Sequence, residues 1–420
     1  MTEPFIPRQP GILSRQAYFE TPVNWVVPTM PPLEDIADDL NGALERGQLS
    51  NGGPNVRQFE HMLEQYLGTH CVCVSSGTAG LYLVSLCVNN TATFLLPAYT
   101  FAATALAFAM DRRQLIIGDI ARESLTLSID PSLNVQLTEV DTIVPVNVYG
   151  NPPDIEHIER VATAHGQAVV YDSAHGLGST YGRRKVGTFG LAEVFSLHAT
   201  KILGCGEGGF VSTTDAALAR EIRARRNFGF AGNTSVLFGC NAKMQEFSAI
   251  LGRWALPRLE QWITQRNELA ITYRNTLKDL PGIRFQHIAD GHYSNNVNFP
   301  IFIDEDFGLT RDELIQALAA DNIIARAYFC PDLTGHASLS QRIKLLAGKP
   351  APNASEASQK VVCLPIYSHQ TKAEVGRICD CIYNIHHYRK DIKHMISSGK
   401  TGLKAENYSQ PAASPLNEGG

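Results

Sequence analysis

The sequence predicts an α/β protein with two domains: a large domain built on a mixed, mainly parallel sheet, and a smaller α+β domain after it. At 420 residues the chain is too long for one small core. Strand and helix patterns alternate over residues 142–171, an order that predicts parallel strands joined by right-handed crossovers. After Trp262 the pattern changes to a long helix followed by separate strands. We therefore expect an N-terminal arm (1–48), a large domain (49–262), a small domain (263–396) and a disordered tail (397–420).

The first part of the large domain predicts a helix, a strand and a second helix. Residues 55–67 place apolar side chains on one helical face, and Gly68 is a stop signal. A short strand is expected at 70–74. The tight turn SSGT follows it and opens a helix over 79–87.

The middle of the chain has the pattern of a parallel sheet. An apolar strand at 142–148 precedes a helix at 155–164, which Asp154 can cap. The next strand is expected at 167–171, and a later one at 209–213 follows a glycine cluster.

Beyond Trp262 we expect the small domain. A long helical segment reaches Leu280, and a strand at 297–303, a helix at 311–321 and a strand at 323–328 follow. Residues 397–420 contain few large apolar side chains, which predicts a disordered tail.

The composition excludes several classes of protein. The formal net charge is −5 and no run of Lys and Arg stands out, so no nucleic-acid partner is expected. The most apolar stretch, 94–110, is interrupted by Pro97 and Tyr99, so no membrane span is expected. The N-terminus lacks the pattern of a signal peptide. Nine cysteines show no zinc-binding spacing. We therefore expect a cytoplasmic protein with reduced thiols and no metal site.

Two residues carry the chemical signal. Asp172 directly follows an apolar strand, and ligands of parallel sheets bind at the carboxyl ends of strands. Lys201 lies among apolar residues and four glycines, a setting that lowers the pKa of an amine and makes it a nucleophile. Alone, the aspartate could cap a helix and the lysine could be a surface charge. Together they form the protein half of a pyridoxal-phosphate (PLP) site, in which the aspartate pairs with the pyridinium nitrogen.

The turn SSGT supplies a candidate cradle for the cofactor phosphate. A helix begins there, and its free N–H groups and dipole attract anions, while Gly77 allows close approach. An ordinary helix start has the same pattern. The sequence has no GxSxG elbow, P-loop or GxGxxG fingerprint, which argues against a serine hydrolase, a P-loop enzyme and a dinucleotide-binding enzyme.

Seven ordered segments resemble the sugar aminotransferases of the DegT/StrS group. The likeness is strong from about residue 49 to 266 and thin beyond. The segments are LSNGGPNVRQFEHMLEQYLG, VSSGTAGLYL, LPAYTFAATALA, PVNVYGNPPDIEHI, VVYDSAHGLGSTYGRRKVGTFG, FSLHATKILGCGEGGFVSTTD and GCNAKMQEFSAILG. The resemblance implies an aspartate-aminotransferase-like fold (PLP fold type I) for the large domain.

The resemblance also implies roles for the residues around the cofactor ring. Lys201 matches the lysine that carries PLP and moves protons in catalysis. Asp172 matches the partner of the pyridine nitrogen. His175 matches a residue that bonds the ring hydroxyl, and Phe101 matches an aromatic residue stacked on the ring.

Further matches concern the cofactor phosphate. Gly77, Thr78 and Ser196 match its contacts within the subunit. Asn241 matches an asparagine that reaches the phosphate from the neighbouring subunit, which implies a homodimer with shared active sites. The sequence departs from the family where Asn-Tyr-Arg-Met becomes Asn-Ala-Lys-Met at 241–244 and where the C-terminal Tyr, Pro-Leu-His pattern becomes AYFCPDLTGHA.

The function implied is transamination of a nucleotide-linked keto sugar with glutamate as the amino donor. The product would be an amino sugar for glycan, O-antigen (lipopolysaccharide) or antibiotic biosynthesis. Two alternatives stay open. A PLP-dependent sugar dehydratase of the same fold would carry histidine in place of Lys201. A non-catalytic, sugar-binding regulatory protein would not need the intact site.

The loop around Lys201, residues 198–209, is called the lysine loop here. Its sequence favours a 4-keto-6-deoxyhexose over a 3-keto sugar as the substrate. Family members that aminate C4 tend to carry a histidine before the lysine and Glu-Gly-Gly after it, as His198 and Glu207 do here. Family members that act at C3 more often carry Tyr-Pro before the lysine and Asp-Gly-Gly after it.

Overall fold

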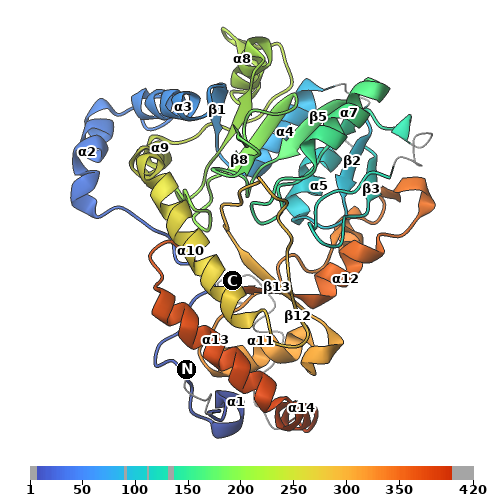
Figure 1. The fold of residues 1–420 in the computed structure, drawn as a ribbon. Coiled ribbons are helices and arrows are strands. Elements are labelled where there is room, and N and C mark those ends of the chain that lie inside the picture. Colours follow the sequence, from blue (N-terminus) through green and yellow to red (C-terminus); the bar gives the residue numbers. More distant parts are fainter. Residues whose placement is uncertain (1–6, 89–91, 111–112, 131–136, 400–420) are drawn as a thin grey trace, which may run out of the picture.

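The computed structural model describes residues 7–88, 92–110, 113–130 and 137–399 (Figure 1). The helices are α1 (Gly11–Ser14), α2 (Ala37–Arg46), α3 (Pro54–Leu67), α4 (Gly77–Cys87), α5 (Ala102–Ala109), α7 (Ile155–His165), α8 (Ala216–Arg225), α9 (Glu246–Ala255), α10 (Leu259–Leu277), α11 (Arg311–Ala320), α12 (Pro352–Lys360), α13 (Lys372–His387) and α14 (Arg389–Ser397). The strands are β1 (His70–Val74), β2 (Phe94–Pro97), β3 (Leu115–Gly118), β4 (Thr142–Ile143), β5 (Ala168–Asp172), β6 (Thr180–Tyr181), β7 (Arg184–Lys185), β8 (Ala192–Ser196), β9 (Gly209–Thr213), β10 (Phe230–Ala231), β11 (Thr234–Ser235), β12 (Ile283–Phe285), β13 (Phe299–Ile303), β14 (Ile343–Leu345) and β15 (Val361–Leu364).

The large sheet has eight strands in the order β1-β9-β8-β5-β4-β2-β3-β14. Strands from β8 to β14 pair in parallel, whereas β9 runs antiparallel to both β1 and β8. The structure therefore confirms the predicted α/β class and the mixed, mainly parallel sheet.

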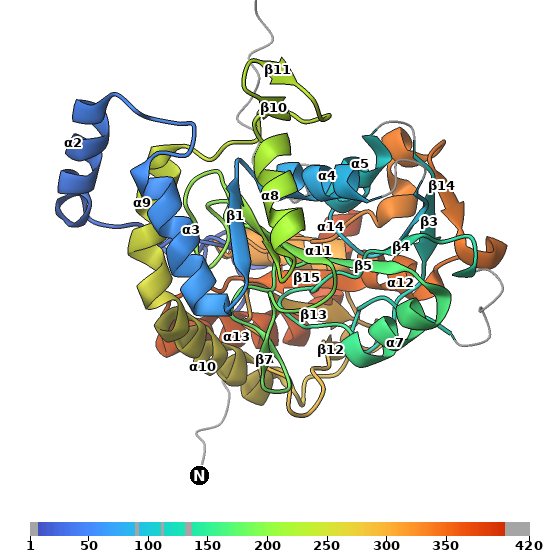
Figure 2. The same ribbon diagram turned by 90° about the horizontal axis from the view of Figure 1, so that it is seen from above.

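Apolar side chains cover both faces of this sheet. Alternate residues of one strand point to opposite faces: Val72 and Val74 of β1 lie in one core with residues of α4 and α8, and Cys71 and Cys73 lie in another with residues of α3 and α9. Figures 1 and 2 show these helices on the two sides of the sheet. Because both faces are buried, the inner strands are continuously apolar, as in Phe94–Pro97.

A second, three-stranded antiparallel sheet, β12-β13-β15, packs with α11 and α13 around a separate core. Helix α10 runs from the large sheet towards this part (Figure 1). Ile12, Phe19 and Val23 of the N-terminal arm belong to the same core, so the arm is held there by apolar contacts. The division of the chain at residue 262 stays a proposal, and β14, which follows that division in sequence, is a strand of the large sheet.

Several predicted elements differ in the structure. The prediction of a strand at 323–328 is wrong. Ile323 forms a single parallel bridge with Val23, and Arg326 forms a single antiparallel bridge with Cys363, so this segment forms no continuous ladder. The strand expected at 142–148 forms a ladder only at its first two residues, because Pro145 has no N–H to donate. Helix α14 ends at Ser397, and most of the predicted tail, 400–420, lies outside the described residues.

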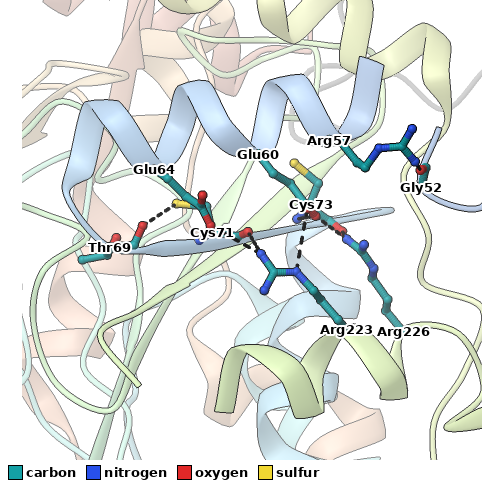
Figure 3. A network of polar contacts seen from close by, with 9 residues as sticks. All are labelled: Gly52, Arg57, Glu60, Glu64, Thr69, Cys71, Cys73, Arg223 and Arg226. Atoms are coloured by element: carbon teal, nitrogen blue, oxygen red, sulfur yellow. Dashed lines mark hydrogen bonds and ion pairs between the residues drawn. The ribbon is translucent and has the colours of Figure 1, made fainter. Parts of the chain in front are cut away.

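Strand β1 is an edge strand, and its outer N–H groups are bonded by side chains of α3 (Figure 3). The N–H of Cys71 donates to the carboxylate of Glu64 at 3.2 Å, and the N–H of Cys73 donates to Glu60 at 2.9 Å. Carboxylates therefore take the place of a neighbouring strand as acceptors.

The outer carbonyl groups of β1 are bonded from α8 and its C-cap. Arg223 donates to the carbonyl of Cys71 at 2.9 Å, and Arg226 donates to that of Cys73 at 2.6 Å. Both arginines also pair with the Glu60 carboxylate. The buried Glu60 is thus neutralised while the free edge of the sheet is fully hydrogen-bonded.

Replacing Arg226 should therefore destabilise the fold. We expect Arg226→Ala to lower the free energy of unfolding by about 1–3 kcal/mol, because it leaves a buried carbonyl and part of a buried carboxylate without a donor. Arg220→Ala, at an exposed position of the same helix, should change it by less than about 0.5 kcal/mol. Urea unfolding of both variants measures the difference, and equal losses would contradict this role of the edge network.

Candidate active site

A cavity of about 470 Å³ opens at the carboxyl edge of the large sheet. Strands β1, β2, β5 and β8 end at this edge, and β9 begins there because it runs the opposite way. Ligands bind at such edges in open α/β sheets. Seven of the predicted site residues line the cavity: Gly77, Thr78, Phe101, Asp172, His175, Ser196 and Lys201.

Asp172 is the last residue of β5 and is buried, with 5% of its surface exposed. Thr104 donates to one carboxylate oxygen at 2.7 Å, and the N–H of Ala174 donates to the other at 3.0 Å. Burial raises the pKa of Asp172, while these two hydrogen bonds and the charge of Lys201 lower it. The donors hold the carboxylate in place and leave it lone pairs for a further cationic partner.

His175 presents a defined ring nitrogen to the cavity. The N–H of Tyr149 donates to its Nδ1 at 3.3 Å, so Nδ1 is the acceptor and the neutral ring carries its proton on Nε2. Burial, followed by the charge of Lys201, lowers the pKa of His175 well below its usual value. The ring of Phe329 stacks against it at 5.8 Å and 11°. His175 is therefore a neutral donor held by its neighbours.

Lys201 lies in the loop between β8 and β9. Backbone hydrogen bonds cross this loop, from Leu197 to Gly208 at 2.9 Å and from Ala199 to Gly206 at 2.8 Å. Burial lowers the pKa of Lys201 to about 8, although the Asp172 carboxylate opposes the shift. The neutral, nucleophilic form of its amine is thus far more populated near physiological pH than in an ordinary lysine, although the protonated form is still the larger fraction.

The first turn of α4 faces the same cavity. Ser76 caps the helix by accepting the N–H of Ala79 at 3.1 Å, and the N–H groups of Gly77 and Thr78 have no partner within the helix. A side chain at Gly77 would meet Ser196 at 3.1 Å. The turn therefore offers backbone donors at the positive end of a helix, which suits a phosphate.

Phe101 and Asn241 differ in position. Phe101, the N-cap of α5, lines the cavity although 53% of its surface is exposed. Asn241 is exposed and is absent from the wall of this chain's own cavity.

His198, Glu207 and Cys205 lie in the same loop as Lys201. The Nδ1 of His198 bonds the hydroxyl of Thr200 at 2.9 Å, and its Nε2 lies 3.8 Å from the carboxylate of Glu207. Both His198 and Glu207 line the cavity and are partly exposed. Cys205 is buried behind them.

Other wall residues were not expected from the sequence. The cavity wall also contains residues of the N-terminal arm and of the segment before β14, namely Trp25, Arg326, Tyr328 and Phe329, and Thr104 of α5 donates to Asp172. Trp25 gave no motif signal, since it lies far from the others in sequence. The segment AYFCPDLTGHA, which departs from the family pattern, was the available sign that residues near Tyr328 reach the site.

Two further findings concern the whole described part of the chain. Among the described residues, no group of three or more His, Cys, Asp or Glu side chains is placed to hold a metal ion. Among the same residues, every helix is too short or too polar to cross a membrane.

Comparison with protein families gives a match over most of the chain. Residues 33–383 match the model of the DegT/DnrJ/EryC1/StrS aminotransferase family. The chain belongs to this family. It is a PLP-dependent aminotransferase, as the sequence predicted.

Individual members of the family are similar over nearly their whole length. The dTDP-4-amino-4,6-dideoxy-D-glucose transaminase of Shigella dysenteriae is 31% identical over 354 residues, covering 83% of this chain and 95% of that protein. The GDP-perosamine synthase of Vibrio cholerae is 27% identical over 352 residues, 82% of this chain and 94% of that protein. DesI, solved in the presence of its TDP-sugar product, superposes with a TM-score of 0.84 at 29% identity, covering 92% and 98% of the two chains.

The solved structures confirm the predicted aspartate-aminotransferase-like fold. A structure of the Escherichia coli GDP-4-keto-6-deoxy-D-mannose-3-dehydratase also superposes, with a TM-score of 0.78 and 19% identity over 87% of this chain and 100% of that chain. That likeness concerns the fold alone.

The residues of this aminotransferase fit PLP. A buried carboxylate, a lysine of lowered pKa, an Nε2–H donor and a helix N-terminus surround one cavity, and they match the ring nitrogen, aldehyde, hydroxyl and phosphate of the cofactor. Asp172, Lys201, His175 and the turn at Gly77 would hold these groups in that order.

The lowered pKa of Lys201 leads to a pH prediction. The rate at which apoprotein captures PLP should rise with pH with a midpoint near 8, because the neutral amine appears as pH passes the pKa of Lys201. An ordinary lysine would give a midpoint near 10.4. Visible absorbance follows the reaction. Lys201→Ala should abolish covalent capture after borohydride reduction, whereas Lys278→Ala, at an exposed position, should not. Retained capture in Lys201→Ala would identify another lysine.

Proposed function

We propose that this aminotransferase moves an amino group from glutamate to a nucleotide-linked keto sugar, at C4 of a 4-keto-6-deoxyhexose. The observation that carries the proposal is the convergence of Lys201 and Asp172 on one cavity in a chain whose relatives include two sugar-aminating enzymes. The product would be an amino sugar for glycan, O-antigen or antibiotic biosynthesis. The presence of Lys201 favours this reaction over the sugar dehydration performed by other members of the fold.

The residues of the chain divide the chemical work. Bound PLP supplies an electron sink for the carbon that loses its proton. Asp172, being a carboxylate, would hold the ring nitrogen of the cofactor and stabilise a proton on it. Lys201, with a pKa of about 8, can accept a proton from one carbon and return it to another, a general acid–base role typically worth about 10²–10⁴ in rate. His175 would donate its Nε2–H to the ring hydroxyl, and the first turn of α4 would bind the phosphate.

Selection of C4 is attributed to the lysine loop. His198 and Glu207, the two positions that differ between C4-acting and C3-acting members, are both in the cavity wall, 3.8 Å apart. A residue change there would shift the resting place of the sugar ring, and a shift of about 1 Å in the reacting carbon can cost roughly 10²-fold in rate.

A panel of substrates tests this function. We expect turnover with glutamate and nucleotide-linked 4-keto-6-deoxyhexoses, at least about 10²-fold faster than with the matched 3-keto sugars. NMR of the product gives the position of the new amine. Amination at C3 alone would overturn the C4 assignment, and loss of water from the sugar without amination would favour the dehydratase.

We propose that the enzyme acts as a homodimer in which Asn241 completes the partner's site. Asn241 is exposed and outside its own cavity. The β10–β11 hairpin that precedes it projects from the body (Figure 2), and apolar side chains are exposed on it, at Phe230, and directly after it, at Val236 and Phe238. Apolar side chains on a projecting hairpin favour contact with another chain. A cytoplasmic location is also proposed, and the nine free cysteines agree with a reducing compartment.

Mixing two inactive variants tests the shared site. Lys201→Ala and a disabling substitution of Asn241, such as Asn241→Asp, should regain activity after subunit exchange, because one of the two composite sites is then entirely wild-type. Random exchange makes half of the dimers mixed, and one of the two sites in each mixed dimer is wild-type. About a quarter of all sites are then intact, so we expect about a quarter of the total activity of the wild-type enzyme. Absence of recovery after exchange has been verified by mass spectrometry would exclude a role for Asn241 in the partner's site.

A further inference from the structure

Among the described residues, the cavity wall contains a buried hydrogen-bond donor without an acceptor. Trp25 lines the cavity, and within the described residues its indole Nε1–H is buried and has no hydrogen-bond partner. A buried N–H that bonds nothing costs free energy. An indole can only donate, so a group able to satisfy it must offer an acceptor.

Arg326 lies in the same part of the wall. The N-terminal arm runs beside the segment that carries it: Val23 bridges Ile323 in parallel, and the N–H of Ile324 donates to the carbonyl of Val23 at 2.9 Å. Trp25 and Arg326 follow these paired residues by two and three positions, and both line the cavity. Burial lowers the pKa of Arg326, although a guanidinium still stays charged at neutral pH. The wall thus combines an indole N–H with a guanidinium, two groups that donate and never accept.

We propose that Trp25 and Arg326 bind the carboxylate on the reacting carbon of the amino donor. This inference rests on the proposed function, which requires an amino acid as donor. Two donor-only groups select an anionic oxygen ligand, and the planar guanidinium fork matches a carboxylate. The subsite accepts any amino acid that carries this carboxylate and does not by itself select glutamate.

The position of the pair favours this carboxylate over the diphosphate of a nucleotide sugar. The ring of Tyr328 packs against both Trp25 and His175, with centroids 5.4 Å and 5.9 Å away, so the indole lies near the ring of His175 in the proposed cofactor site. The α-carboxylate is bonded directly to the carbon that bears the reacting amine. The diphosphate is attached at C1, across the sugar ring from C4, and needs a more distant site.

The donor half-reaction tests the subsite without any sugar. PLP-loaded enzyme is mixed with L-glutamate or with 4-aminobutyrate, which has the same chain but no carboxylate on the carbon bearing the amine. Visible absorbance gives the second-order rate constant for each donor. We expect the wild-type preference for L-glutamate to fall about 10-fold in Trp25→Phe and at least as much in Arg326→Gln, since each loses a hydrogen bond to a charged group. Rates with 4-aminobutyrate should not change.

Controls separate this role from a structural one. Trp262→Phe is the matched variant, because Trp262 is buried in a different core and does not line the cavity; it should keep the wild-type preference. Melting temperatures establish whether each variant folds. If Trp25→Phe does not fold, Arg326→Gln still tests the subsite. The reverse half-reaction with a nucleotide-linked 4-amino sugar should be unaffected in both variants.

Several outcomes would overturn the inference. An equal fall in the rate constants for L-glutamate and 4-aminobutyrate would mean that Trp25 and Arg326 only support the fold. A loss confined to the nucleotide-linked amino sugar would assign the pair to the diphosphate. A wild-type enzyme that prefers L-glutamate no more than 4-aminobutyrate has no such subsite. Failure of every keto sugar in the panel would reject the proposed function alone, because the donor half-reaction uses no sugar.

Discussion

The site depends on the close packing of β9 against the first turn of α4. A Cβ added to Gly209 would lie 2.6 Å from the carbonyl oxygen of Phe195 and 2.7 Å from the nitrogen of Gly77, so only glycine fits. This approach sets the distance between the helix N-terminus and the strand pair β8–β9. Since the loop of Lys201 joins those two strands, the same contact also fixes where the lysine faces Asp172. The glycine cluster GEGG is therefore a packing requirement as well as a family motif.

Burial shifts the pKa values of the two charged groups of the cavity in opposite directions, because it disfavours the charged form of each. It raises the pKa of Asp172 and lowers that of Lys201, while the attraction between the two opposes both shifts. His175, which feels the cation and the burial together, stays neutral. A flat, charged ligand entering this space meets an amine that is easily deprotonated, together with a carboxylate and a neutral donor that hydrogen bonds or stacking already hold in place.

Local patterns were sufficient for much of the fold and for seven of the residues that line the cavity. The strands at 70–74 and 209–213 form as predicted, because each is apolar and bounded by strong turn signals. Gly77 begins α4, Asp172 ends β5 and Lys201 lies in the loop that follows β8, so their convergence follows from the order of the sheet, in which β1, β5 and β8 end at the same edge. The wall residues Trp25 and Arg326 could not be predicted in this way. Trp25 and Arg326 are brought together by pairing between an arm and a segment that never forms a regular strand, and single bridges leave no periodicity in the sequence. Strand β14 was missed for the same reason, since three residues far from the rest of the sheet carry too short a pattern.

The side chains that cover the outer edge of β1 also restrict how this protein can assemble. An open strand edge is a template on which another chain can add a strand, which leads to unselective association and to fibres. Here the N–H and carbonyl groups that such a strand would use are already bonded to Glu60, Glu64, Arg223 and Arg226. At this end the large sheet therefore cannot grow by recruiting strands from other molecules, and a copy that docks here must contact side chains and not the backbone of β1.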